Sequence, residues 1–296
     1  VKEEKRLRVD NQPYGKFLEN VKKNLFIKHP YRWTTIGEME HLDAATLDEF
    51  LAFNKKFYVP NNAVLVVAGD IDIASTKEMI QNYFGNIPRG AEIERNYEKD
   101  DPITEAITAT AYDPNIQIPA VINAYRTPGF SERDSKVLDM ISTYLSDGPS
   151  SKLYKKLVDE KKMALQTGAF NISQEDYSMY VIFGLPLGDN SLNDLVSEMD
   201  EEIVKIQNQL ISERDYQKLQ NKIENAFVNS NASVEGIANS LARYYMLYDD
   251  TNLINTEIDV YRSITREEIK DVANKYLNPN QRLVLEYLPE TKEKEL

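Results

Sequence analysis

The chain contains the stretch TLDEFLAFNKKFYVPN (Thr46–Asn61), and 219 positions later it contains TREEIKDVANKYLNPN (Thr265–Asn280). Each stretch begins with a Thr that is followed three residues later by a Glu, the pattern of a helix capping box. Apolar residues then recur at helical spacing, and a Pro-Asn pair ends the helix before an apolar run typical of a strand. Sixteen positions align without a gap. This favours a duplicated domain plan over the chance recurrence of a common helix–turn–strand unit.

Duplicated domains should be similar in size, and this sets the expected domain division. A stretch rich in charge and poor in apolar residues predicts a linker at 91–105. The second domain then covers 106–296, whereas only residues 1–90 remain for the first. We therefore expect residues 1–90 to be the C-terminal half of a first domain whose N-terminal half precedes this sequence.

The remaining elements follow from periodicity. Residues 1–10 and 14–25 predict two helices, and residues 28–42 predict a loop. The run Ala63–Ala68 predicts a buried strand, followed by a helix over 74–84. Beyond the linker we expect the strands and helices at 106–112, 120–126, 131–145, 151–161, 164–172, 179–185, 192–207, 213–229, 234–248, 265–276 and 282–288. The strands at 164–172 and 179–185 are expected to pair.

Composition excludes several classes of function. The 296 residues carry 35 Lys and Arg against 48 Asp and Glu, a formal net charge of −13. This charge argues against a nucleic-acid partner, which requires a basic surface. Cysteine is absent, which excludes disulfides, thiolate zinc sites and cysteine nucleophiles. The longest apolar runs are shorter than the roughly 18 residues of a membrane span, so we expect no such span.

Several motifs together resemble the pitrilysin/insulinase family of inverted zinc peptidases, which includes mitochondrial processing peptidase. They are Lys28-His29-Pro30-Tyr31, Thr35-Ile36-Gly37, Phe57-Tyr58-Val59-Pro60-Asn61-Asn62, Ala68-Gly69-Asp70-Ile71, Tyr83-Phe84-Gly85-Asn86-Ile87-Pro88 and Asp147-Gly148-Pro149-Ser150-Ser151-Lys152-Leu153-Tyr154. The resemblance implies an α+β fold with two homologous domains that face each other across a substrate chamber. Each domain would be an antiparallel sheet packed against helices, and the first domain would be incomplete here.

The family's chemistry depends on an H-x-x-E-H helix, whose two His bind zinc and whose Glu acts as the general base. The sequence has only His29 and His41 and no H-x-x-E-H, so the resemblance places that motif in the absent half-domain. A further Glu on a later helix completes the family's ligand set. Register with the family places this metal ligand at Glu4. The alternative is that the charged run around Glu4 is an exposed helix end with no role in metal binding. We expect both His residues to serve packing or surface roles.

Members of the family also use an Arg and a Tyr, seven residues apart in the second domain, to hold the substrate backbone. Register places these positions at Val158 and Leu165, and neither side chain can donate a hydrogen bond. Either a related partner subunit supplies the two donors, or the chain is a non-catalytic paralogue.

The resulting hypothesis is the C-terminal part of a zinc-dependent metalloendopeptidase, inactive as this chain because H-x-x-E-H is absent. Zinc would be the cofactor of the full-length parent, and peptides would be the substrate. A homodimer or heterodimer with a related subunit is expected, in a bacterial periplasm or cytoplasm. The alternative is a non-catalytic assembly or peptide-holding subunit with the same fold. An intact or degraded H-x-x-E-H upstream would discriminate between them.

Overall fold

The computed structural model describes residues 1–290 of the chain. These residues divide into two compact units, which we describe separately. The first unit contains residues 1–38, 97–220 and the part after 262, and the second contains 39–96 and 221–262. None of the helices within residues 1–290 combines the length and apolar character that a bilayer crossing requires. The proposed linker at 91–105 and the domain division based on it stay predictions.

The first unit is built on a five-stranded sheet with the order β1-β5-β2-β4-β3. Its strands are β1 (Ile107–Asp113), β2 (Ala120–Pro128), β3 (Ala164–Ile172), β4 (Tyr177–Pro186) and β5 (Arg282–Pro289). The pairs β2–β4, β2–β5 and β3–β4 are antiparallel, and β1 and β5 are parallel. The predicted α+β fold with a sheet packed against helices is confirmed, and so is the pairing of β3 with β4.

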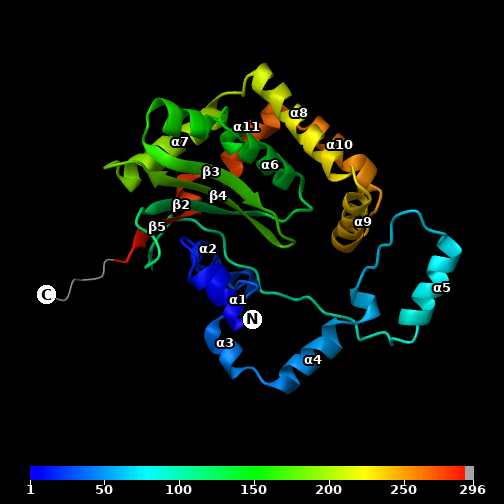
Figure 1. The fold of residues 1–296 in the computed structure, drawn as a ribbon. Helices are drawn as coiled ribbons and strands as arrows, with labels where there is room; N and C mark the ends of the chain where they lie inside the picture. The colour runs from blue at the N-terminus through cyan, green and yellow to red at the C-terminus, as the bar shows by residue number, and fades with distance from the viewer. Residues whose placement is uncertain (291–296) are drawn as a thin grey trace. The chain divides into compact units, whose positions relative to one another are not determined.

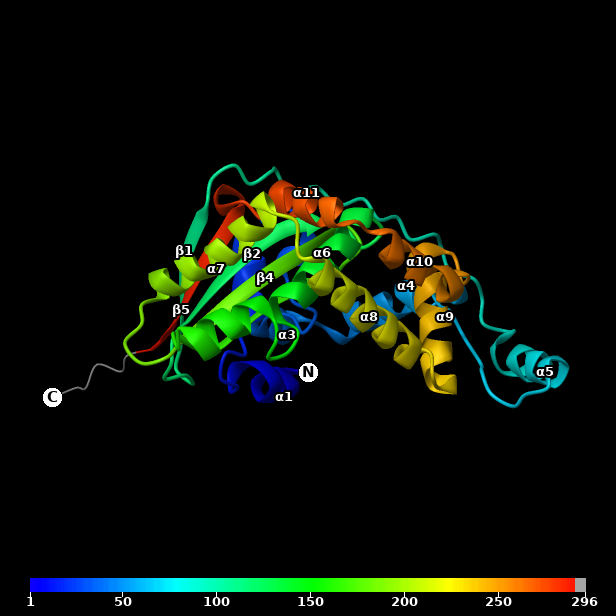
Figure 2. The ribbon, with the colours of Figure 1, turned by 90° about the horizontal axis from the view of Figure 1, so that it is seen from above.

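Three long helices cover one face of this sheet (Figure 1). They are α6 (Arg133–Ser146), α7 (Leu192–Asn208) and α11 (Arg266–Tyr276). Their apolar side chains are buried because they recur every three or four residues and so form one stripe toward the strands. Gly184 of β4 lets α7 approach closely, since a Cβ there would lie 3.3 Å from the Leu195 side chain. Figure 2 shows α6 and α7 lying over the strands of the sheet.

The opposite face is covered in part by the N-terminal segment. Helix α1 (Lys2–Lys5) continues as π-helical residues Arg6–Asp10, and α2 (Phe17–Leu25) then lies against the sheet. Val21 and Leu25 of α2 join a core cluster with β2, β4 and β5 side chains. This core extends to Phe26, so the N-terminal segment is part of the unit's hydrophobic interior.

Asp100 fixes the chain just after α2. Its carboxylate accepts hydrogen bonds from the backbone N–H groups of Ile27 (2.7 Å), Lys28 (3.0 Å) and His29 (3.1 Å). Burial opposes ionisation of this carboxyl, but the three N–H donors and the nearby Arg126 outweigh it and lower its pKa. A single buried carboxylate thus anchors residues 27–29 to the segment that leads into β1.

The second unit contains helices α3 (Met39–Ala44), α4 (Leu47–Phe57), α5 (Ile73–Phe84), α9 (Val234–Tyr248) and α10 (Leu253–Ser263). The boundary between the two units falls within α8 (Glu213–Ser230), where the chain enters the second unit for the second time. Tyr244 donates a 2.5 Å hydrogen bond to the Glu257 carboxylate, which joins α9 to α10. In contrast, α4 and α5 contain no buried residue.

Two local expectations are wrong. Ala63–Ala68 was expected as a buried strand, but these residues form no strand in the structure, and Leu65 and Val67 are 58% and 43% exposed. A strand requires hydrogen-bonded neighbours, and no other strand within residues 1–290 pairs with this segment. Residues 28–42 were expected as a loop, whereas α3 begins at Met39. Helix α10 was not predicted at all.

Candidate functional site

Glu4, the predicted metal ligand, lies on α1 with its side chain 47% exposed. Its Oε1 is 3.4 Å from Nε of Arg8, one helical turn later. The neighbouring Lys5 points the other way, is buried, and pairs with Glu19 at 3.2 Å. The Glu4 carboxylate is therefore accessible at the surface of the first unit, and its role as a ligand stays a prediction.

A catalytic zinc takes three protein ligands and leaves a position for water. Within residues 1–290 no three His, Cys, Asp or Glu side chains gather in a group that could hold a metal ion. The described residues thus do not fit a complete zinc site. Glu4 could contribute one ligand, and the others would have to come from outside these residues.

His29 is a packing residue, as expected. Its side chain is 1% exposed, and its Nε2 lies 3.2 Å from Oδ2 of Asp176. Its Nδ1 accepts a hydrogen bond from the backbone N–H of Tyr31 at 3.2 Å and so caps a short 3₁₀ turn. Aromatic rings of Phe26, Tyr31, Tyr97 and Tyr177 surround the imidazole. His41 lies exposed on α3.

The two positions at which the family's Arg and Tyr were expected lie around the start of β3. Val158 is on the π-helical segment Tyr154–Glu160, and Leu165 is on β3. Leu165 is 51% exposed at an irregularity between Ala164 and Gln166 in the pairing with β4. An exposed leucine at the edge of the sheet offers no side-chain donor to a substrate.

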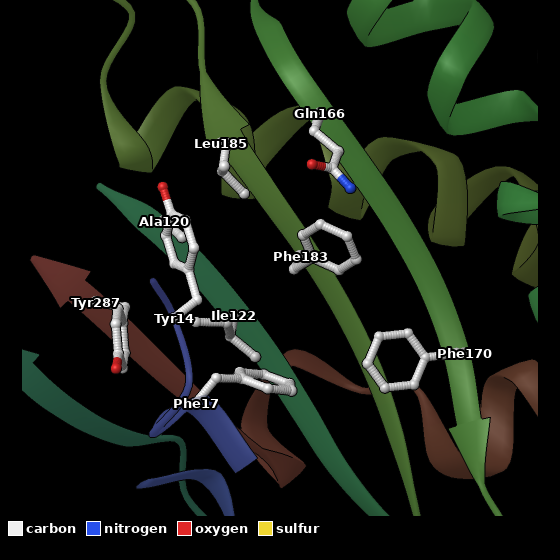
Figure 3. A pocket seen from close by; sticks show the side chains of 9 residues that line it. All are labelled: Tyr14, Phe17, Ala120, Ile122, Gln166, Phe170, Phe183, Leu185 and Tyr287. Carbon is white, nitrogen blue, oxygen red and sulfur yellow. The ribbon is translucent and has the colours of Figure 1, made fainter. Parts of the chain in front are cut away.

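Sequence reasoning missed a pocket on the sheet face that carries α2. This sheet pocket has a volume of about 230 Å³. It is lined by Tyr14, Phe17, Ala120, Ile122, Gln166, Phe170, Phe183, Leu185 and Tyr287, which come from four strands and the N-terminal segment (Figure 3). Gln166 is the one lining side chain with an amide, and the others are apolar or aromatic.

Tyr14 forms one wall of the sheet pocket, and its backbone has a positive φ of 60°. Asp113 holds it there by accepting its backbone N–H at 3.0 Å, and the Tyr14 hydroxyl donates to the Ile118 carbonyl at 2.7 Å. The same Asp113 carboxylate accepts the Tyr287 hydroxyl at 2.9 Å. Burial, followed by the negative charge of Asp113, raises the pKa of Tyr14, and burial with this hydrogen bond raises that of Tyr287.

Comparisons with known proteins place the chain in a family. The model of the peptidase M16 inactive domain matches residues 44–223. The zinc protease PqqE of Helicobacter pylori is 28% identical over 287 residues, which cover 95% of this chain and 64% of that protein. An uncharacterized zinc protease of Mycobacterium leprae is 22% identical, over 86% of this chain and 57% of its own length. The chain therefore spans about three fifths of these relatives.

Solved structures agree. The crystal structure of a protease from Helicobacter pylori superposes with a TM-score of 0.89 at 25% identity and covers 96% of this chain and 69% of its own. The peptidase M16 inactive domain from Pseudomonas fluorescens gives a TM-score of 0.81 at 14% identity, covering 96% of this chain and 68% of its own, and so shares the fold. The chain belongs to the pitrilysin-like M16 peptidase family and carries that family's inactive domain.

Proposed function

We propose that this chain is the non-catalytic, C-terminal part of a longer zinc-dependent endopeptidase that cleaves peptides in a two-domain chamber. The match of residues 44–223 to the M16 inactive domain carries the proposal. Two relatives are named zinc proteases, which supports the enzymatic part of the proposal. This chain covers only part of their length, which supports its being one part of a longer protein.

The surface of α4 supports the same proposal. Phe50 and Phe53 on this helix are 54% and 57% exposed, although a helix of this amphipathic type normally buries its apolar stripe. In the duplicated helix α11 the equivalent Ile269 and Val272 are 1% and 5% exposed. Residues 1–90 would thus be the rear half of a first domain, and the H-x-x-E-H segment would belong to the half that covers α4.

Glu4 is the residue through which we expect this chain to contribute to the zinc site of the parent. The experiment uses the parent protein, with its upstream segment, and two variants that change adjacent carboxylates, Glu4→Gln and Glu3→Gln. Glu4→Gln should lower both the zinc content and the hydrolysis of a quenched-fluorescent peptide, whereas Glu3→Gln should leave both close to the parent's values. Undiminished zinc in Glu4→Gln would remove Glu4 from the site.

A second candidate function is a non-catalytic assembly or peptide-holding subunit of the same fold. Val158 and Leu165 favour it, because the positions expected to hold the substrate backbone carry no donors. In the enzyme, these donors would come from a related partner in a homodimer or heterodimer. A degraded H-x-x-E-H in the upstream coding sequence, with no zinc in the purified parent, would select the subunit. For either function we propose a bacterial periplasm or cytoplasm.

A further inference from the structure

One wall of the sheet pocket is Tyr14, whose backbone is in the left-handed conformation. A positive φ is unfavourable for a residue with a side chain, and such backbone strain is concentrated at binding and catalytic sites. Tyr14 is kept in this conformation by contacts 99 and 104 residues away in the sequence, at Asp113 and Ile118. These bonds fix the ring of Tyr14 as a wall, 6.0 Å from the ring of Tyr287.

A glycine shapes the opposite wall. A Cβ at Gly168 of β3 would lie 2.6 Å from the ring of Phe183, so this ring can lie over β3 only because residue 168 has no side chain. The ring of Phe170 lies 6.2 Å from Phe183 and 6.4 Å from Phe17. Five aromatic rings therefore surround the sheet pocket, and Ala120 on β2 leaves the space between them unfilled (Figure 3).

The volume selects the size of the occupant. An apolar protein cavity of about 150 Å³ binds benzene, and pockets for drug-sized ligands begin at about 300 Å³. The sheet pocket, at about 230 Å³, accommodates one aromatic ring with its methylene group. Aromatic pairs attract each other beyond the burial of their area, so a lining of rings favours an aromatic occupant over an aliphatic one.

Gln166 gives the sheet pocket a polar group that suits a peptide. Its side chain is exposed and lines the pocket beside Phe183 and Leu185 (Figure 3). A primary amide both donates and accepts, and so matches the C=O and N–H of a peptide group. An aromatic side chain in the pocket would place its own backbone within the region of this amide.

We propose that the sheet pocket binds an aromatic side chain of an extended peptide, with Gln166 contacting the backbone of that residue. The choice of a peptide as ligand rests on the proposed function, whereas the aromatic preference rests on the pocket alone. The site would hold a peptide on the inactive domain and so contribute to substrate choice.

The test measures binding to this chain, without zinc and in the presence of EDTA. Two blocked pentapeptides, Gly-Gly-Phe-Gly-Gly and Gly-Gly-Ala-Gly-Gly, are titrated into the protein by NMR chemical-shift perturbation. The Phe peptide should bind at least about tenfold more tightly, which corresponds to about 1.4 kcal/mol. The variant Ala120→Leu, which fills the pocket, should abolish this preference, whereas Ala106→Leu, at an exposed position outside it, should keep it.

If Ala120→Leu does not unfold cooperatively, Leu185→Trp replaces it, since the much larger side chain would occupy the pocket from a half-buried position. Equal affinity for the two peptides, no binding of either, or a preference that survives in a folded filled variant would overturn the proposal. Hydrolysis plays no part in these titrations. An inactive or zinc-free parent would therefore contradict the proposed enzyme without affecting the measured peptide preference. Conversely, a titration without aromatic preference would contradict the proposed pocket without affecting the zinc and activity tests of the parent.

Discussion

The two copies of the helix–turn–strand unit have the same local structure and different surroundings. Helices α4 and α11 each span 11 residues, and each begins after a Thr cap with a complete capping box. A 3₁₀ turn follows each, at Pro60–Asn62 and Pro279–Gln281. In the C-terminal copy the next residues form β5, which lies between β1 and β2. In the earlier copy, Ala63–Ala68 pair with no strand in the part of the chain that the structure describes. Local sequence thus sets the cap, the helix and the turn, and partners decide the strand.

The sharpest contrast should appear in hydrogen exchange. Amides of Leu283–Tyr287 lie in a central strand with partners on both sides, so their exchange requires opening of the core. Amides of residues 64–68 have no strand partner among residues 1–290. We expect the β5 amides to exchange at least about 10³-fold more slowly than these, given a stability of roughly 5 kcal/mol or more.

Exchange measured by NMR at two protein concentrations checks this and controls for self-association. Protection of residues 64–68 equal to that of β5 at both concentrations would show that the segment has found strand partners within the chain. Protection that rises with concentration would assign those partners to a second copy.

The second-largest difference should appear when equivalent apolar residues of the two helices are replaced by alanine and the free energy of unfolding is measured. Ile269→Ala removes a side chain that is 1% exposed and should lower the free energy of unfolding by about 2–5 kcal/mol. Phe50→Ala, at the matching position, removes a side chain that is 54% exposed and should change it by less than about 0.5 kcal/mol. Urea unfolding followed by circular dichroism measures both. A comparable loss in Phe50→Ala would mean that the apolar face of α4 is covered in solution.

Sequence reasoning succeeded where the determining contacts are local. The Thr–Glu pairs, the Pro-Asn breakers and the apolar stripes predicted α4, α11 and their turns because all the interacting residues lie within one helix length. It failed for Ala63–Ala68, whose β-forming side chains cannot supply a partner strand. Helix α3 is too short for periodicity to reveal. Helix α10 could have been predicted, because the apolar residues Ile254, Ile258 and Tyr261 recur at helical spacing.

The site was harder to predict than the fold. The sheet pocket depends on Tyr14, Asp113 and Tyr287, which lie far apart in the sequence and meet only in the folded unit. Their combination has no short motif. Apolar spacing places Tyr14 in the helix expected over 14–25, whereas α2 begins at Phe17. The turn residues Pro13 and Gly15 on either side of Tyr14 were the available signal that the helix begins later.

Loss of the caps should have a smaller effect. Thr265→Ala and Thr46→Ala each remove a hydroxyl that accepts a backbone N–H, at 3.1 Å and 3.4 Å respectively, and each should cost about 1 kcal/mol of helix stability. Only Thr265→Ala should shift the unfolding of the sheet-containing unit, because α11 packs on that sheet. Thr265→Ser, which keeps the hydroxyl, is the control. If thermal unfolding showed equal shifts in the unfolding temperature of this unit for both Ala variants, the prediction would be contradicted.

The smallest expected difference concerns the two capping glutamates. Hydrogen bonds lower the pKa of both from 4.5, mainly from Arg133 for Glu268 and mainly from the Thr46 backbone for Glu49. A lowered pKa means that the folded state favours the ionised form. The stabilisation is therefore present above about pH 4.5 and is lost as the pH falls through the folded pKa.

Arg133 Nε lies 2.7 Å from Glu268 Oε1, so Arg133→Ala should raise the pKa of Glu268 toward 4.5 and leave that of Glu49 unchanged. Arg266→Ala is the matched control, since Arg266 Nε pairs with Glu213 at 3.6 Å. Carboxyl carbon shifts followed by NMR between pH 2 and 7 measure each value, and an unmoved Glu268 in Arg133→Ala would show that the capping box alone lowers its pKa, as it does in the earlier copy.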